Sequence, residues 1–155
     1  SIIIENAVSY GIAFASVAEI EEHNILGATY MAMNRAIAQL SQAPELALID
    51  GNQTKGIEHN CRSIVGDAKC ASIAAASILA KVTRDRLMLE YAEKYPQYGF
   101  ASHKGYGTAE HYAALREYGH CEIHRLSFLK KFFAEDSAWT KNLSGASESR
   151  PPQNS

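Results

Sequence analysis

Leu46-Ala-Leu-Ile49, followed at once by Asp50 and Gly51, is a short apolar run from which the rest of the chain can be interpreted. Its length, and the proline and glycine that flank it, are typical of a strand that is buried on both faces. A second brief strand is predicted at 63–65, and an alanine-rich helix is predicted over 71–91. Strands that alternate with helices in this way predict an α/β fold.

The chain upstream of Leu46 predicts a strand and a long helix. Large and small residues alternate over 8–16, which is the period of a strand. Ser16 and Glu19 form a capping-box signature, and apolar residues then recur at steps of three and four. We therefore expect a helix over 17–40.

The chain beyond the alanine-rich helix predicts a loop, a short helix and a tail. Glycines and aromatic residues gather over 98–107, and loops of this kind commonly carry function. Thr108 is the expected cap of a short helix that Gly119 ends. Residues 134–155 are rich in Ser, Glu, Asn and Pro, which predicts a disordered tail after a domain that covers 1–133.

Composition limits the classes of protein to which the chain can belong. Its 155 residues fit one domain, and 46% of them are hydrophobic. The net charge of −2 gives no overall basic field, so a nucleic acid must be held by a local patch. The three cysteines form no CxxC pair, which predicts reduced thiols and no structural zinc. Every apolar run is shorter than the roughly 20 residues that span a bilayer, so we expect no membrane contact.

Two carboxylates follow the two predicted strands. Asp50 comes directly after the first strand, and Asp67 follows Gly66 at the next strand-to-helix junction. If the strands are neighbours, both side chains meet at the edge where open α/β sheets bind ligands. Hard oxygen ligands of this kind suit Mg²⁺ or Mn²⁺. The alternative is that Asp50 only begins a turn and Asp67 only caps a helix.

Several motifs carry a family resemblance. In chain order they are Asn24-Ile-Leu26, Ile49-Asp-Gly51, Gly66-Asp-Ala-Lys69, Ser72-Ile-Ala-Ala-Ala-Ser-Ile-Leu-Ala-Lys-Val-Thr-Arg-Asp85, His103-Lys-Gly-Tyr-Gly-Thr108 and His124-Arg-Leu-Ser-Phe128. Together they closely resemble the type 2 ribonuclease H family, the bacterial ribonuclease HII enzymes, over about residues 2–130. The resemblance implies a ribonuclease H-like fold, with a mixed sheet flanked by helices.

The resemblance also implies a metal centre. In that family four carboxylates hold two divalent ions at the scissile phosphate, and the third and fourth of these ligands match Asp50 and Asp67. Two ions can activate the attacking water and stabilise the leaving 3′ oxygen. Asp50 and Asp67 are therefore the expected catalytic residues, and two Mg²⁺ or Mn²⁺ ions are the expected cofactors.

The matched motifs further imply residues that bind the substrate. Tyr106 matches the family's tyrosine that stacks against the sugar at the RNA-to-DNA junction, a role that suits a flat ring because it tolerates any base. Lys69, Lys81, Arg84 and Lys104 lie in or beside the motifs and are expected to contact phosphates. The alternatives are a tyrosine that packs on the core and basic residues that are solvated surface charges.

Other ionisable residues receive structural roles. Asp85 matches no ligand position and is expected to form a salt bridge on the helix surface. His103 and His124 belong to family motifs with structural or substrate-facing roles, whereas His111 and His120 are expected at the surface. We expect none of these histidines to bind metal.

The chain departs from the family pattern at its start. The family's Asp-Glu-x-Gly-Arg-Gly motif, which supplies two metal ligands and contacts the ribose 2′-hydroxyl, does not occur in it. The chain begins at Ser1 rather than at a methionine, so we expect it to be the C-terminal part of a longer protein. Because the missing strands would lie between 8–16 and 46–49, we expect exposed strand edges and helix faces. We also expect the isolated chain to fold poorly and to be inactive.

The expected function is endonucleolytic hydrolysis of RNA in RNA–DNA hybrids and of the bond 5′ to ribonucleotides embedded in duplex DNA. The products would carry 5′-phosphate and 3′-hydroxyl ends, as ribonucleotide excision repair requires. We expect a cytoplasmic monomer whose partner is a hybrid or a ribonucleotide-containing duplex. Two alternatives stay open: a non-catalytic remnant that binds hybrids through Tyr106 and its basic neighbours, and a fragment with no role of its own.

Overall fold

In the computed structural model the chain is mostly helical, and the structure describes residues 2–65 and 70–132. Asp67, Lys69 and the tail predicted over 134–155 lie outside these residues. The elements, in chain order, are α1 (Ile2–Asn6), α2 (Val17–Ala38), β1 (Ala47–Asp50), β2 (Cys61–Ile64), α3 (Ala71–Lys94), the 3-10 helix η2 (Pro96–Tyr98), α4 (Phe100–His103), α5 (Ala109–Tyr118) and α6 (Leu126–Phe132).

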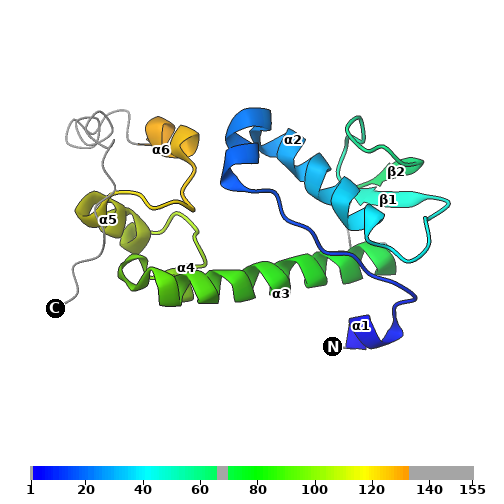
Figure 1. The fold of residues 1–155 in the computed structure, drawn as a ribbon, viewed down its shortest axis with the longest axis horizontal. Helices are drawn as coiled ribbons and strands as arrows, with labels where there is room; N and C mark the ends of the chain where they lie inside the picture. Colours follow the sequence, from blue (N-terminus) through cyan, green and yellow to red (C-terminus); the bar gives the residue numbers. More distant parts are fainter. Residues whose placement is uncertain (1, 66–69, 133–155) are drawn as a thin grey trace.

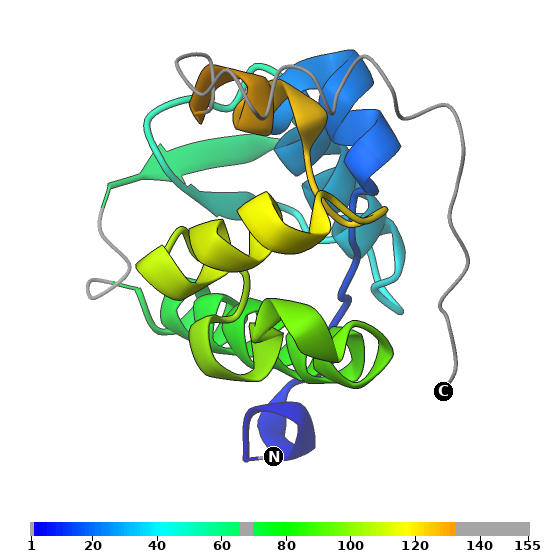
Figure 2. The same ribbon diagram turned by 90° about the vertical axis from the view of Figure 1, so that its left-hand side faces the viewer.

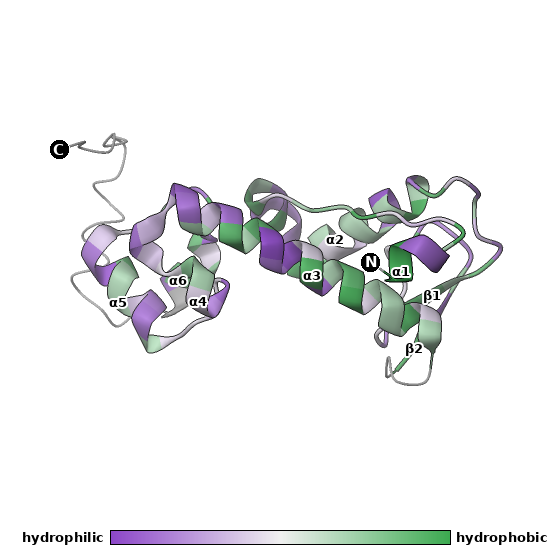
Figure 3. Ribbon diagram, turned by 90° about the horizontal axis from the view of Figure 1, so that it is seen from below, coloured by the Kyte–Doolittle hydropathy of each residue, from purple (hydrophilic) through white to green (hydrophobic). Residues whose placement is uncertain are grey.

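Helix α3 connects the two ends of the molecule. Helix α2 and the strands lie over one end of it, and α4, α5 and α6 gather at the other (Figure 1). Helix α6 turns back towards α2 (Figure 2), and the backbone N and Oγ of Ser127 donate to the Glu21 carboxylate at 3.1 and 2.9 Å. The part of α3 next to the sheet is mostly hydrophobic, and more hydrophilic residues follow towards α4 (Figure 3).

Strands β1 and β2 are parallel neighbours. Ala47 pairs with Cys61 at one end, and Asp50 pairs with Ile64 at the other. The mixed sheet that the sequence led us to expect is not present in the described residues. A mixed sheet needs an antiparallel neighbour, and the extended segment at 8–16 packs along α2 instead of joining either strand.

The connection from β1 to β2 is held against α2. Asn34 donates from Nδ2 to the carbonyl of Gly56 at 2.9 Å and accepts from the backbone N of Glu58 at 3.1 Å. A Cβ added at Gly56 would lie 2.2 Å from a ring carbon of Tyr30, so this close approach requires glycine. These contacts fix the path of the chain after Asp50.

Burial of β1 alternates along the strand. Ala47 and Ile49 are buried, whereas Leu48 is 36% exposed and Asp50 is also exposed. The prediction of a strand buried on both faces is therefore wrong for this structure. One face of this two-stranded sheet therefore carries the buried Ala47 and Ile49, and the other carries the more exposed Leu48 and Asp50.

Residues 8–16 are extended but form no strand, so this prediction is also wrong. A strand needs a ladder partner, and here side chains of α2 and of the residue that follows it bond the backbone instead. The N of Ile12 donates to Oε1 of Gln39 at 2.9 Å, and Arg35 donates to the carbonyl of Phe14 at 3.1 Å. The alternation of large and small residues thus fits a segment laid along a helix as well as a strand.

The predicted capping box of α2 is confirmed. Ser16 Oγ accepts from the N of Glu19 at 3.2 Å, and the Glu19 carboxylate accepts from the N of Ser16 at 2.8 Å. The helix also has an interruption that the apolar periodicity did not predict: Asn24 adopts φ 60° and ψ 171°. Its Oδ1 accepts from the N of Leu26 at 2.9 Å and so caps the second part of the helix.

The remaining predictions of secondary structure are largely confirmed. The helix predicted over 71–91 is α3, and the brief strand predicted at 63–65 is β2, shifted toward the N-terminus. Thr108 caps α5 and Gly119 ends it with φ 76°, as expected. The loop predicted over 98–107 contains α4 and the end of η2.

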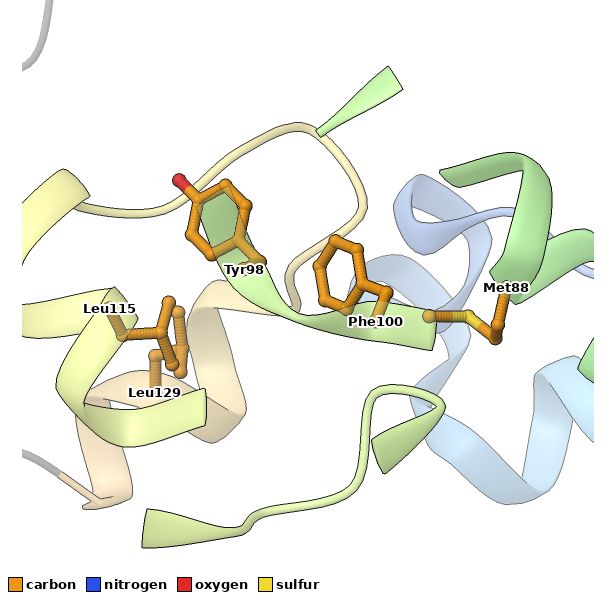
Figure 4. Packing of buried hydrophobic residues seen from close by; sticks show 5 residues of the cluster. All are labelled: Met88, Tyr98, Phe100, Leu115 and Leu129. Atoms are coloured by element: carbon orange, nitrogen blue, oxygen red, sulfur yellow. The ribbon is translucent and has the colours of Figure 1, made fainter. Parts of the chain in front are cut away.

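The main hydrophobic core lies at the α4 end of the molecule. It consists of Met88 from α3, Tyr98, Phe100, Leu115 from α5 and Leu129 from α6 (Figure 4). Phe100 and Leu115 are each 1% exposed, and the rings of Tyr98 and Phe100 stack with centroids 5.4 Å apart. This core fixes the start of the segment that carries Tyr106.

Both long helices present apolar side chains to solvent, as expected. The exposed ones include Ile25 and Leu26 on α2, and Ile78, Val82 and Leu89 on α3. Of the 22 residues of α2 only Ala28 is fully buried, and the others are partly buried or exposed. Poor folding of the isolated chain stays a prediction.

Candidate functional site

Asp50 lies where its sequence position predicted, at the C-terminal end of a strand. It is the last residue of β1, and its side chain is exposed. A groove runs between this strand end and α2, and it is lined by Leu26, Thr29, Tyr30, Met33, Ile49, Asp50, Gly51, Asn52 and Gln53. The hydroxyl of Tyr30 is buried and has no hydrogen-bond partner among the described residues. The groove thus combines an exposed carboxyl group with the polar side chains of Asn52 and Gln53.

The residues at this strand end fit part of a divalent metal site. A carboxylate, together with the amide oxygens of Asn52 and Gln53, is the hard donor set that Mg²⁺ and Mn²⁺ prefer. Over residues 2–65 and 70–132, no three His, Cys, Asp or Glu side chains are grouped to hold an ion. Asp67, the second expected ligand, falls in the gap between these ranges. β2 runs parallel to β1, and the chain enters this gap one residue after β2 ends.

A second candidate site surrounds Tyr106. Its ring is 65% exposed, so the alternative of a tyrosine packed on the core does not hold. The guanidinium of Arg84, from α3, lies 5.2 Å from the ring centroid. Lys104 and Gly105, directly before Tyr106, both have positive φ, 51° and 79°. A Cβ at Gly105 would lie 3.1 Å from the end of Met88, so the loop rests on α3 beside the core.

Two lysines lie near this ring, Lys81 in an ion pair and Lys104 in a hydrogen bond to the backbone. Lys81 forms the expected surface salt bridge with Asp85, at 2.7 Å and one helical turn apart. The hydrogen bond from Lys81 lowers the pKa of Asp85, and the positive charges of Lys81, Arg84 and Lys104 act in the same direction. Lys104 donates to the carbonyl of Ala101. The structure therefore brings Lys81, Arg84 and Lys104 together around Tyr106, whereas Asp50 belongs to the separate groove.

Histidines are buried beneath the loop that carries Tyr106. His103, His111 and His124 are 7%, 6% and 8% exposed. The prediction that His111 lies at the surface is wrong, and His120 is half-buried rather than exposed. The spacing of four between His111 and Leu115 places both on the buried face of α5, and this periodicity is the signal that the motif-based reasoning missed.

Burial makes the imidazoles of His111 and His124 weaker bases. It lowers the pKa of His124 to about 4, helped by the charge of His111, and it lowers the pKa of His111. Burial also raises the pKa of the Cys121 thiol, which lies 3.1 Å from Nδ1 of His124. At neutral pH His111 and His124 are therefore uncharged, and the Cys121 thiol is protonated.

We expect the stability of the full-length protein to fall as the pH falls from about 6.5 toward about 4. His124 has its unperturbed pKa of 6.5 in the unfolded chain and about 4 in the fold, so the unfolded state binds more protons between these values. The loss of unfolding free energy from this residue is about 3 kcal/mol. Urea unfolding at pH 7, 5.5 and 4.5 measures this loss of unfolding free energy. The same pH dependence in a His124→Gln variant would contradict the role of His124.

None of the helices over 2–65 and 70–132 is both long and apolar enough to cross a membrane.

Comparison with known proteins covers most of the chain. The family model of ribonuclease HII matches residues 1–131. The chain is 56% identical over 130 residues to ribonuclease HII of Clostridioides difficile (strain 630) and 54% identical over 129 residues to ribonuclease HII of Endomicrobium trichonymphae. It is 57% identical over 128 residues to ribonuclease HII 1 of Methylibium petroleiphilum.

These alignments cover 82–83% of the chain but 51%, 61% and 65% of the three relatives. The chain thus spans about half to two-thirds of the length of the curated relatives it matches. The family implies a ribonuclease H-like fold, to which the parallel strands and the long helices contribute. Because the family model matches nearly every described residue and over half of the aligned residues are identical in each relative, the chain belongs to the ribonuclease HII family.

Proposed function

We propose that the full-length protein is an endonuclease that hydrolyses RNA in RNA–DNA hybrids and cuts 5′ to single ribonucleotides in duplex DNA. It would use two divalent ions, Mg²⁺ or Mn²⁺, and leave 5′-phosphate and 3′-hydroxyl ends. Family membership supports this reaction class. The observation that carries the proposal is the position of Asp50, an exposed carboxylate at the open end of two parallel strands.

Asp50 and Asp67 are the catalytic residues in this proposal. The parallel pairing of β1 with β2 supports it, because the chain leaves both strands at the same edge of the sheet. When bound, the ions would supply charge stabilisation and an activated water at the scissile phosphate. The chain's own residues hold and orient them: Asp50 would supply a negative oxygen, and Asn34 fixes the segment that follows it.

The cluster around Tyr106 is the proposed substrate contact. An exposed ring with Arg84 over it offers a flat surface for a sugar or base and a positive charge for a phosphate. Lys81, Lys104 and Lys69 are proposed as further phosphate contacts. The Lys81–Asp85 pair reduces the charge available at this point, so we assign most of the attraction to Arg84 and Lys104.

The test is cleavage of a labelled DNA duplex that contains one ribonucleotide, with Mg²⁺ or Mn²⁺, by the full-length protein. We expect a single cut 5′ to the ribonucleotide, a 5′-phosphate on the downstream product, and no cut in an all-DNA duplex. Salt-sensitive binding of the duplex without any cleavage would overturn the proposal in favour of the non-catalytic alternative.

Replacing Tyr106 tests the proposed junction contact. Tyr106→Ala should raise KM for the single-ribonucleotide duplex about tenfold, because stacking on an aromatic ring contributes about 1–3 kcal/mol. Tyr106→Phe keeps the ring and should stay within about twofold of the wild-type value. The measurement is steady-state cleavage at several duplex concentrations. A phenylalanine variant as impaired as the alanine variant would show that the ring is not what binds the substrate.

A further inference from the structure

The buried histidines form a directed chain of hydrogen bonds that ends at Tyr106. The backbone N–H of Cys121 donates to Nδ1 of His124 at 2.9 Å, so this nitrogen carries no proton. Neutral His124 therefore carries its proton on Nε2, which lies 3.1 Å from Nε2 of His111. His111 accepts there, and its own proton is on Nδ1, 3.0 Å from the carbonyl oxygen of Tyr106.

A second imidazole holds the neighbouring backbone. His103 accepts from the N of Gly105 through Nδ1 at 3.2 Å, and its Nε2 lies 2.7 Å from the carbonyl of Tyr98. The rings of His103 and His111 stack with centroids 4.5 Å apart. One peptide unit before Tyr106 and the one directly after it are thus bonded to buried imidazole rings.

The network is enclosed by aromatic groups of the core. The ring of Phe100 lies 5.5 Å from that of His111 and 5.7 Å from that of His124. The titratable groups that face the pair are Tyr98, His103, Tyr112, His120 and Cys121. No carboxylate is among these, and burial disfavours the charged form of both imidazoles. The chain of bonds needs an unprotonated nitrogen on each ring, so it requires neutral rings.

We propose that His111 and His124, as a neutral pair, are positioning residues that fix the backbone of Tyr106 and thereby hold its ring beside Arg84 for substrate binding. This inference rests on the proposed function of Tyr106. Neither histidine touches the substrate. His111 acts through the Tyr106 carbonyl, and His124 acts through His111 by supplying the proton that sets its tautomer.

A matched pair of variants isolates the bond to Tyr106. Asparagine and leucine have the same branched shape, but only asparagine places an N–H near the position of Nδ1. His111→Leu in the full-length protein should raise KM for the single-ribonucleotide duplex about five- to tenfold with kcat little changed, because it leaves the Tyr106 carbonyl with one donor fewer. His111→Asn should stay within about twofold of wild type.

A double variant separates positioning from a general loss of structure. If His111 acts through Tyr106, adding His111→Leu to Tyr106→Ala should change KM by less than about twofold. Additive effects of the two changes would overturn the inference. If Tyr106→Ala raises KM and His111→Leu does not, the positioning role of the histidines is wrong but the role of Tyr106 stands. If Tyr106→Ala has no effect on KM, both the proposed role of Tyr106 and the positioning role of the histidines are wrong.

Ring-nitrogen NMR of the wild-type protein tests the same inference without any variant. Long-range ¹H–¹⁵N spectra at pH 7 should show His111 protonated on Nδ1 and His124 protonated on Nε2. The opposite tautomers, or a charged ring at either position, would overturn the relay even if the leucine variant does not fold.

Discussion

Asp50→Asn in the full-length protein should reduce the rate of metal-dependent cleavage by about a hundredfold or more, because metal ions contribute several kcal/mol to the transition state. Asparagine keeps the size of the side chain and one oxygen but removes the negative charge at the end of β1. Asp50 is exposed and accepts no hydrogen bond that the described structure records, so the fold should survive the change. Single-turnover cleavage at saturating Mg²⁺ measures the effect.

Glu45→Gln is the matched control for this variant. It removes the same charge from an exposed carboxylate that precedes the strand instead of ending it. We expect wild-type cleavage from this variant. Cleavage by Asp50→Asn at the rate of Glu45→Gln would remove Asp50 from the catalytic residues.

Phe100→Ala should lower the free energy of unfolding by about 3–5 kcal/mol, the usual cost of removing a fully buried aromatic ring. Phe100 is 1% exposed, and its ring contacts Tyr98, His103, His111 and His124. The cavity would open between the core and the histidines beneath Tyr106. Urea unfolding of the full-length protein at pH 7.5 measures the loss.

Phe128→Ala provides the control for size and aromaticity. Phe128 on α6 is 45% exposed, with the Arg125 guanidinium 5.1 Å from its ring centroid. Its replacement should cost about 1 kcal/mol, the scale of an exposed cation–π contact and partial burial. If the two alanine variants lost equal stability, Phe100 would not be the centre of the core.

Features set by neighbouring residues were predictable from the sequence. Ser16 and Glu19 form the capping box because both partners lie within one turn, and Thr108 and Gly119 bound α5 for the same local reason. The position of Asp50 after β1 and the ion pair of Lys81 with Asp85 also follow from short spacings. Family membership was predictable as well, because motifs spread along the chain carry it, and the comparisons confirm it.

Features that depend on distant partners were not predictable in this way. The alternation over 8–16 suits a strand, but whether a strand forms depends on a ladder partner elsewhere in the chain, and here α2 takes that place. The open face of β1 at Leu48 depends on which elements cover the sheet. Burial of His111, and the stacking of Arg84 on Tyr106, arise only when α3, α4 and α5 pack together.

Mn²⁺ binding by the full-length protein, measured by isothermal titration calorimetry, tests most directly whether the end of β1 is a metal centre. We expect saturable binding by the wild type and by Glu45→Gln, and affinity at least about tenfold lower in Asp50→Asn, since even groups that only orient a ligand change affinity by this amount. Equal Mn²⁺ affinity of Asp50→Asn and the wild type would contradict the assignment of Asp50 as a metal ligand.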